Sequence, residues 1–347
     1  MNSIPNLKFD GIIMRIYDLK FFTHISAFIF VFILISFNSY TVSGKMNVDI
    51  WLQELKSEAI ERGIRKDTLE KAFKGFKPIP RIIELDRRQP EFTLTFPSYL
   101  SKVIPDSRVK RGKKKYLENK ILIDKIAKEY GVQSRFIMAF WGVETSYGRH
   151  FGGFSVVHSL ATLAYDGRRS KFFRGELFRA LRILNQGHIS HEKMKGSWAG
   201  AMGNFQFMPS SFENFAIDYD GDGKRDIWNN KGDAFASAAN YLSKSGWKSN
   251  QTWGRAIKLP KIFDQSLANK KIKKTILEWQ NLGIRRINGG DLPKRNLLAS
   301  IVIARNKKTE KKGKPYMVYS NYDVTLKWNR STFFAIAIGL LADQIGN

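Results

Sequence analysis

Apolar residues recur at helical spacing over most of the chain. Between positions 52 and 60 they fall three and four residues apart, which places them on one face of a predicted helix. A second short helix is predicted over 67–73, and helical spacing resumes over about 111–131. Residues 134–239 are predicted to be almost wholly helical, with glycine-rich turns between the helices.

Two segments depart from the helical pattern. Pro78 and Pro80 interrupt it, and we predict an extended or irregular connection over 84–96. Residues 253–324 carry short apolar runs separated by Gly, Asn and Lys clusters, which is typical of a small sheet. A last apolar helix, over 331–341, is expected to pack back onto the helical core.

These elements predict an α+β fold that is mostly α. We divide it into a helical subdomain over 45–115, a helical core over 116–252 and 326–347, and a small sheet-containing subdomain over 253–325. With 347 residues, 43% of them apolar, the chain can bury a large core.

The N-terminus has the order of a secretory signal. Arg15 and Lys20 precede an apolar run of 13 residues over 25–37, and small or polar residues follow up to position 44. Because a spanning helix needs about 20 apolar residues, a cleaved signal is favoured over a permanent anchor. We expect a periplasmic protein, anchored in the inner membrane if the signal is not cleaved, with Met14 as the natural start.

The charge of the chain limits which partners it can bind, and its cysteine content limits its chemistry. The chain has 58 Lys and Arg against 31 Asp and Glu, a net charge of +27, so its surface attracts polyanions. Nucleic acid, an anionic membrane and the carboxylates of a bacterial wall would all satisfy that charge. No nucleic-acid-binding motif is present, and the absence of cysteine excludes disulfides, thiol catalysis and lipid attachment through a cysteine.

One acidic residue, Glu144, stands out in the strongly apolar segment 136–148. Aromatic neighbours would remove water from its carboxyl group, and desolvation raises a carboxyl pKa towards the range where it can deliver a proton. Cleavage of a glycosidic bond needs such an acid. The alternative is a glutamate at a helix end that reaches solvent.

The segment 196–212 combines three glycines with Ser197 and Gln206. Glycines at Gly200 and Gly203 are expected to let a ligand approach the backbone closely. The alternative is a tight structural turn between two helices.

The segment from Asp218 to Lys224 matches the first seven positions of a calcium-binding loop, with oxygen ligands at alternate positions and then a glycine. Position twelve is Asn229 instead of a glutamate, so the closing ligand would have to be Asp233 in a longer loop. An Asx-rich turn without metal is the alternative.

Together these segments resemble the membrane-bound lytic murein transglycosylase B family, glycoside hydrolase family 103. The resemblance rests on ELDRRQPEFTLTF (84–96), GVETSYGRHFG (142–152), KGSWAGAMGNFQFMPSS (195–211), DYDGDGKRDIWN (218–229), ANYL (239–242) and KWNRSTFFA (327–335). It covers essentially the whole chain after the N-terminal signal, and it implies that the helical core is lysozyme-like.

The resemblance also implies roles for single residues. The acid of the family falls on Glu144, and its substrate-groove residues fall on Ser197, Gln206, Tyr241 and Asn329. Its calcium ligands fall on Asp218, Asp220, Asp222, the Lys224 carbonyl and Asp233, with one extra residue before the last. Trp328 and Phe334 stand where some relatives carry tyrosines, so we expect a hydroxyl contact there to be missing.

The implied activity is cleavage of peptidoglycan between N-acetylmuramic acid and N-acetylglucosamine, forming 1,6-anhydromuramyl ends, with Glu144 as acid and then base. A water-using muramidase and a non-catalytic peptidoglycan-binding protein are the alternatives. We expect glycan strands as the partner, no nucleic acid, membrane association through the N-terminal segment, a monomer, and no cofactor beyond a structural Ca²⁺.

Overall fold

We describe the protein from a computed structural model, which covers residues 46–87, 94–306, 308–310 and 312–346. Residues 46–347 form one compact unit. The predicted signal over 1–44 lies outside the described residues. Among the described helices, none combines the length and the apolar character that a membrane crossing needs.

The described part of the chain begins with three helices, α1 (Val48–Glu61), α2 (Lys66–Ala72) and α3 (Pro80–Arg87). The prediction of an irregular connection over 84–96 is wrong at both ends, because α3 runs to Arg87 and α4 (Phe96–Val103) begins at Phe96. A proline favours the first turn of a helix, where its missing N–H is not needed, so Pro80 begins α3 instead of breaking the chain.

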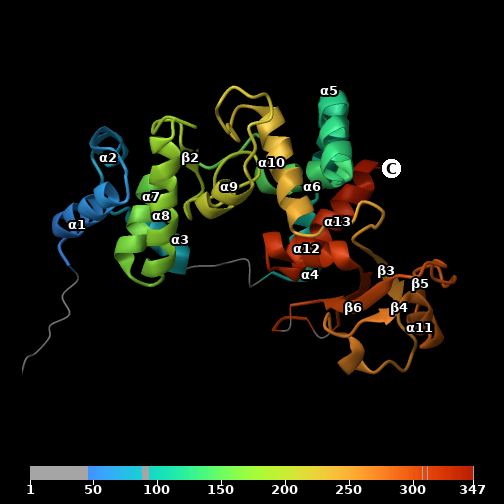
Figure 1. Cartoon of the computed structure of the whole chain (residues 1–347). Coiled ribbons are helices and arrows are strands. Elements are labelled where there is room, and N and C mark those ends of the chain that lie inside the picture. Colours follow the sequence, from blue (N-terminus) through green and yellow to red (C-terminus); the bar gives the residue numbers. More distant parts are fainter. Residues whose placement is uncertain (1–45, 88–93, 307, 311, 347) are drawn as a thin grey trace, which may run out of the picture. The chain divides into compact units, whose positions relative to one another are not determined.

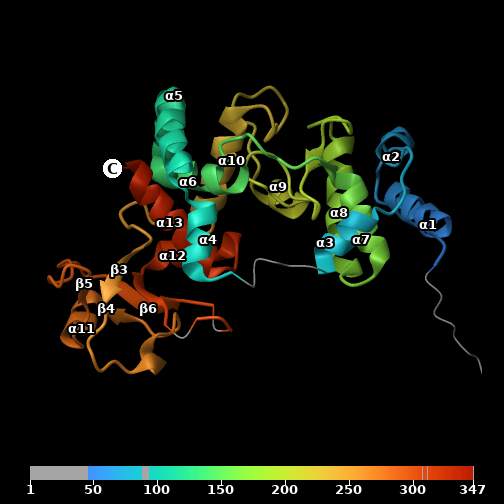
Figure 2. The ribbon, with the colours of Figure 1, turned by 180° about the vertical axis from the view of Figure 1, so that it is seen from behind.

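Helix α3 packs against α7 (Val156–Asp166), which lies beside α8 (Ser170–Asn185), as both views show (Figure 1, Figure 2). Asp86 of α3 is almost completely buried, and its carboxylate accepts a hydrogen bond of 2.6 Å from Arg168 and a second from Arg169. This pair of arginines neutralises a buried charge, which would otherwise be costly.

The main helical core forms around α5 (Asp106–Tyr130), α6 (Ser134–Thr145) and α13 (Thr332–Gly346). Helix α10 (Lys231–Lys244) contacts α5 and α6, and α4 contacts α13. The remaining helices of this region are α9 (Pro209–Phe215) and α12 (Ser320–Trp328), and a two-stranded antiparallel sheet pairs β1 (Phe154–Ser155) with β2 (Lys195–Gly196) across the two helices between them. Helix α5 crosses the boundary that the sequence suggested between residues 115 and 116.

The expected small sheet has five antiparallel strands in the order β4-β6-β7-β3-β5. The strands are β3 (Gly254–Lys258), β4 (Lys274–Thr275), β5 (Arg285–Arg286), β6 (Leu298–Ala304) and β7 (Lys314–Val318), with the 3₁₀ turn η2 (Gln265–Leu267) and helix α11 (Ile276–Asn281) between them.

The two faces of this sheet belong to different cores. Val302 and Tyr316 join the main hydrophobic core of the helices, whereas Ile301 and Met317 join a second, smaller core with Trp279 of α11. Successive side chains of a strand point to opposite faces, so one alternating pattern serves both cores. The sheet-containing subdomain is therefore packed against the helical core through one face of its own sheet.

Candidate active site

Glu144 lies in the last turn of α6, a helix whose side chains are otherwise largely buried. The chain leaves α6 through a sharp turn in which Ser146 and Tyr147 both have positive φ, 53° and 64°. Few residues other than glycine adopt this conformation without a supporting structure. Arg111 of α5 supplies part of that support, since its guanidinium donates a 3.0 Å hydrogen bond to the Ser146 hydroxyl.

The turn after α6 is also bonded to the segment that follows β2. The Thr145 hydroxyl donates to the backbone carbonyl of Asn204 over 2.8 Å, and the Trp141 indole donates to the Asn204 side chain over the same distance. These buried bonds fix the end of the helix, and with it the backbone of Glu144, against a second segment of the chain.

The Glu144 side chain is half-buried, and burial raises its pKa from 4.5 to about 8. Its Oε1 accepts a 2.8 Å hydrogen bond from the indole N–H of Trp328, which partly offsets the rise because it stabilises the ionised form. The carboxyl group is therefore largely protonated at neutral pH. This agrees with the expectation of a desolvated acid and disagrees with a glutamate that simply reaches solvent.

Trp328, the last residue of α12, is held by other aromatic rings. The centroid of its ring lies 4.5 Å from that of Phe140 on α6 and 4.6 Å from that of Tyr241 on α10. We expected a hydroxyl contact to be missing at this position. Trp328 offers none, and its indole N–H donates to the acid instead.

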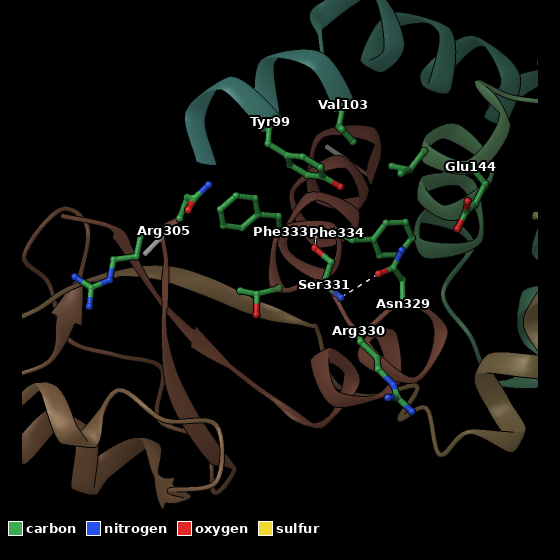
Figure 3. A pocket seen from close by; sticks show the side chains of 12 residues that line it. Tyr99, Val103, Glu144, Arg305, Asn329, Arg330, Ser331, Phe333 and Phe334 are labelled. Atoms are coloured by element: carbon green, nitrogen blue, oxygen red, sulfur yellow. Dashed lines mark hydrogen bonds between the residues drawn. The ribbon is translucent and has the colours of Figure 1, made fainter. Parts of the chain in front are cut away.

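Glu144 faces a cavity of about 750 Å³, within the size range of small-molecule sites. Figure 3 shows the side chains that line this cavity, with Glu144 at one end of the group and Arg305 at the other. Among the described residues that line the cavity, Glu144 is the one carboxylate. The lining residues are Tyr99, Val103, Val143, Glu144, Arg305, Asn306, Asn329, Arg330, Ser331, Thr332, Phe333 and Phe334.

Several of these residues carried no signal in the sequence. Tyr99 comes from α4, and Arg305 and Asn306 follow β6 of the small sheet. Each reaches the cavity only through tertiary packing between segments distant in sequence, so no local pattern could have identified them.

The structure brings two of the predicted groove residues to the acid. Asn329 lines the same cavity, where its side-chain oxygen accepts a 2.9 Å hydrogen bond from the Ser331 backbone N–H (Figure 3). Tyr241 packs against Trp328, and its hydroxyl donates to the Lys327 carbonyl over 2.9 Å. Tyr241 is therefore connected to Glu144 through the indole ring.

Ser197 and Gln206 do not line this cavity. The Ser197 hydroxyl oxygen accepts the backbone N–H of Ala201 over 3.0 Å, which closes a tight turn. The Gln206 side-chain amide donates to the Phe151 carbonyl over 3.1 Å, next to Gly152. The two residues lie in the segment that follows β2, close to the β1–β2 strand pair.

The glycines of this segment make room for the protein itself. A Cβ atom on Gly200 would lie 2.4 Å from the Leu160 side chain, and one on Gly203 would lie 2.7 Å from the Ile227 carbonyl. On the side where a Cβ atom would stand, the space beside each glycine is filled by neighbouring residues, which accounts for glycine at both positions. The structural-turn interpretation holds for both.

The predicted calcium loop brings three carboxylates together. Oxygens of Asp218, Asp220 and Asp222 lie within 4.8 Å of one another, a donor set that suits a hard cation. Asp233 lies outside this group, fully buried, and its two oxygens accept the backbone N–H groups of Tyr219 and Asp226 over 2.8 Å each. Asp233 thus holds the two ends of the loop together.

Comparison with known proteins decides the family. The sequence profile of the transglycosylase SLT domain family matches residues 47–343. The chain belongs to this family.

A curated relative of the chain is a lytic murein transglycosylase of the B type. The chain is 32% identical over 197 residues to membrane-bound lytic murein transglycosylase B of Escherichia coli strain K12, a match that covers 54% of each protein. The chain thus spans about half the length of the curated relative it matches. The resemblance to the lytic murein transglycosylase B family is confirmed.

Solved structures agree with the family assignment. SltB3 of Pseudomonas aeruginosa in complex with NAG-anhNAM-pentapeptide is 40% identical with a TM-score of 0.83, over 87% of this chain and 80% of that one. The lytic transglycosylase Slt35 of Escherichia coli in complex with calcium is 26% identical with a TM-score of 0.70, over 85% and 92%. The predicted α+β, mostly helical, lysozyme-like fold is confirmed.

Proposed function

We propose that this protein is a lytic transglycosylase that cleaves the β-1,4 bond between N-acetylmuramic acid and N-acetylglucosamine in peptidoglycan. The observation that carries the proposal is Glu144, the one carboxylate among the described residues of the cavity, with its pKa raised to about 8. Family membership over nearly the whole chain supports the same reaction.

Glu144 acts twice in the proposed reaction. In the first step its protonated carboxyl gives a proton to the glycosidic oxygen, the bond to the muramyl carbon breaks, and the 2-acetamido group of the sugar stabilises the developing cation. In the second step the carboxylate takes the proton of the muramyl 6-hydroxyl, whose oxygen closes the 1,6-anhydro ring. Glu144 ends protonated, and no water is consumed.

Trp328 decides which oxygen of Glu144 carries the proton. An indole N–H can donate a hydrogen bond but cannot accept one, so the oxygen facing it, Oε1, must be an acceptor in both charge states. In a neutral carboxylic acid the carbonyl oxygen is a better acceptor than the hydroxyl oxygen, so we place the proton of the neutral acid on Oε2. We assign Oε2 as the atom that delivers the proton to the substrate.

Ser197, Gln206, Tyr241 and Asn329 are proposed to bind the glycan strand. Asn329 lines the cavity of Glu144, and Tyr241 packs on Trp328, so these two lie close to the proposed bond cleavage. Ser197 and Gln206 lie close to the β1–β2 strand pair and would contact the glycan strand away from the cavity.

We propose a structural Ca²⁺ at Asp218, Asp220 and Asp222, with the Lys224 carbonyl as a further ligand. A bound Ca²⁺ would offset most of the negative charge of the three neighbouring carboxylates and tie the loop together. Because Asp233 already bonds two backbone N–H groups, we assign it a role in shaping the loop. Calorimetric titration with CaCl₂ should show binding that the double change Asp218→Asn with Asp222→Asn abolishes, and an unchanged titration would overturn this site.

We further propose a periplasmic monomer that acts on glycan strands of the cell wall. The proposed substrate, peptidoglycan, forms the cell wall. The N-terminal order of charged and apolar residues is that of an export signal. If that signal is retained, the same segment would associate the protein with the inner membrane.

Mass spectrometry of the fragments released from purified peptidoglycan tests the reaction. The protein should release anhydromuramyl products, and Glu144→Gln should release none, since the amide cannot give or take the proton. Muramyl products with reducing ends would instead make the protein a water-using muramidase. Binding without release would make it a non-catalytic peptidoglycan-binding protein.

A further inference from the structure

Helix α5 carries a stripe of exposed residues that the proposed activity does not use. Leu117 and Ile121 are 70% and 89% exposed, four positions apart on the same side of the helix. Single exposed aliphatic residues are common on soluble proteins. Two adjacent side chains that are this exposed form a small apolar surface whose contact with water is unfavourable.

The neighbours of the pair along the stripe are lysines. At about 100° per residue, Lys110, Lys114, Lys125 and Lys128 fall within an arc of about 80° together with the two aliphatic residues. All four lysines are exposed. With a rise of about 1.5 Å per residue, the stripe is about 27 Å long, with its apolar pair near the middle and lysines towards both ends.

The opposite face of α5 is buried. Its buried residues Gly112, Asn119, Ile123, Ile126 and Ala127 lie on the other side of the helix, where α5 contacts α6, α10 and α13. This packing orients the stripe away from the core. The two views of the fold show α5 along the edge of this helical group (Figure 1, Figure 2).

The acidic residues nearest the stripe are engaged by their own neighbours. Lys115 pairs with Glu118, and Lys120 pairs with Asp124. Glu129 accepts a hydrogen bond of 3.1 Å from the hydroxyl of Tyr219. The exposed surface that remains along the stripe is positively charged around an apolar centre.

We propose that the α5 stripe, formed by Lys110, Lys114, Leu117, Ile121, Lys125 and Lys128, docks on the surface of an anionic lipid bilayer. A basic helix face with a few aliphatic side chains suits the interface between headgroups and acyl chains, where lysines meet anionic lipids and aliphatic groups leave water. The helix would lie along the surface without crossing it.

Two effects add in this arrangement and can be separated. Loss of one lysine near an anionic surface weakens partitioning about fivefold, and added salt reduces this contribution. Loss of both aliphatic side chains weakens partitioning about tenfold or more, with little dependence on salt. A surface held by charge alone would show only the first effect.

Co-sedimentation with vesicles measures both effects. Residues 46–347, which hold both hydrophobic cores and omit the apolar N-terminal run, are mixed with vesicles of equal parts phosphatidylglycerol and phosphatidylcholine, or of phosphatidylcholine alone. We expect binding to the anionic vesicles only. The double change Leu117→Gln with Ile121→Gln should lose it about tenfold, whereas Leu277→Gln with Leu282→Gln, two exposed leucines at α11, should not.

A fluorescent label locates the contact. Because the chain has no cysteine, Ile121→Cys and Leu282→Cys each create one labelling site for an environment-sensitive dye. Binding should move the dye at position 121 into an apolar environment and leave the dye at 282 in water. Binding with no change at 121 would overturn the proposal, and so would sedimentation showing that the stripe joins two copies of the chain.

Discussion

At position 144 a carboxyl group lies among aromatic side chains and accepts one hydrogen bond from an indole. Its environment favours the neutral form in the resting protein, yet the donor on Oε1 keeps ionisation within reach once the proton has been given away. An acid that must later act as a base needs both properties. Trp328, which bonds Glu144, and Asn329, which lines the same cavity, are adjacent in sequence.

The pH dependence of catalysis should follow Glu144. Since the acid must be protonated to begin the reaction and its pKa is about 8, kcat should fall as pH rises through that region. Turnover of purified glycan strands across pH measures this limb. A fall centred below about pH 6 would contradict the assignment, because an ordinary carboxyl would then suffice.

The same shift has a consequence for stability. The folded pKa of about 8 lies above the ordinary 4.5, so between these values the unfolded chain releases a proton that the folded protein keeps. Glu144 therefore costs stability increasingly as pH rises from 4.5 towards 8. Glu144→Gln should raise the melting temperature more at about pH 7 than at about pH 4, and an equal rise at both would contradict the shift.

Removal of the indole donor tests the role of Trp328. Trp328→Phe keeps an aromatic ring but loses the N–H, so the alkaline limb of kcat should move to higher pH and kcat itself should fall by on the order of tenfold. Phe207→Leu is the matched control, because Phe207 packs 5.3 Å from Trp328 without bonding the acid. If both variants leave the limb in place, Trp328 contributes packing alone.

At the scale of elements, close packing fixes how α13 meets the sheet. Gly339 of α13 lies against the indole of Trp253, and a Cβ atom there would lie 2.1 Å from the ring. Trp253 is buried and donates a 2.9 Å hydrogen bond to Asp343 one turn further along α13, so it cannot easily move aside. Helix α13 also carries the cavity residues Phe333 and Phe334 near its first turn.

Gly339→Ala should therefore destabilise the protein by about 2 kcal/mol, as overpacking of a core does. Gly175→Ala in α8 is the control, because the nearest atom to its Cβ is the flexible end of Arg179 at 3.2 Å. At position 175 the better helix propensity of alanine should raise the free energy of unfolding by at most about 1 kcal/mol. Urea unfolding measures both, and equal effects at the two positions would contradict the packing argument.

At the scale of the whole molecule, one sheet joins two hydrophobic cores. Alternate residues of β6 and β7 belong to the main core and to the core around Trp279. Unfolding of these strands would therefore disrupt both cores at once. The small subdomain also supplies Arg305 and Asn306 to the cavity of Glu144. Its stability and the shape of the cavity are therefore coupled.

A substitution that destabilises the small core around Trp279 should lower the stability of the whole protein. Trp279→Ala should remove about 3–5 kcal/mol of stability and lower the temperature of a single transition, followed equally by helix content and by tryptophan fluorescence. Leu277→Ala, at an exposed position of the same helix, should change it little. Two separate transitions in the Trp279 variant would show that the cores unfold independently.

Much of this organisation could be predicted from the chain alone. Helical spacing located α1, α2, α6 and α13, and short apolar runs located the sheet, because periodicity depends only on which residues face the core. The prolines before residue 81 misled the prediction, since a proline that breaks one helix can also begin the next, as Pro80 does for α3. Here the local pattern allowed two outcomes and packing against α7 chose one.

The sequence by itself indicated the family and the mostly helical fold and singled out Glu144 as the candidate acid, because these depend on residue types at fixed spacing along the chain. The tertiary structure alone decided what surrounds that acid. The hydrogen bond from Trp328 and the contribution of Arg305 and Asn306 to the cavity come from segments more than a hundred residues away. Hydrogen bonding acts through space, so only the folded chain could show which donor meets the carboxyl group and how far burial raises its pKa.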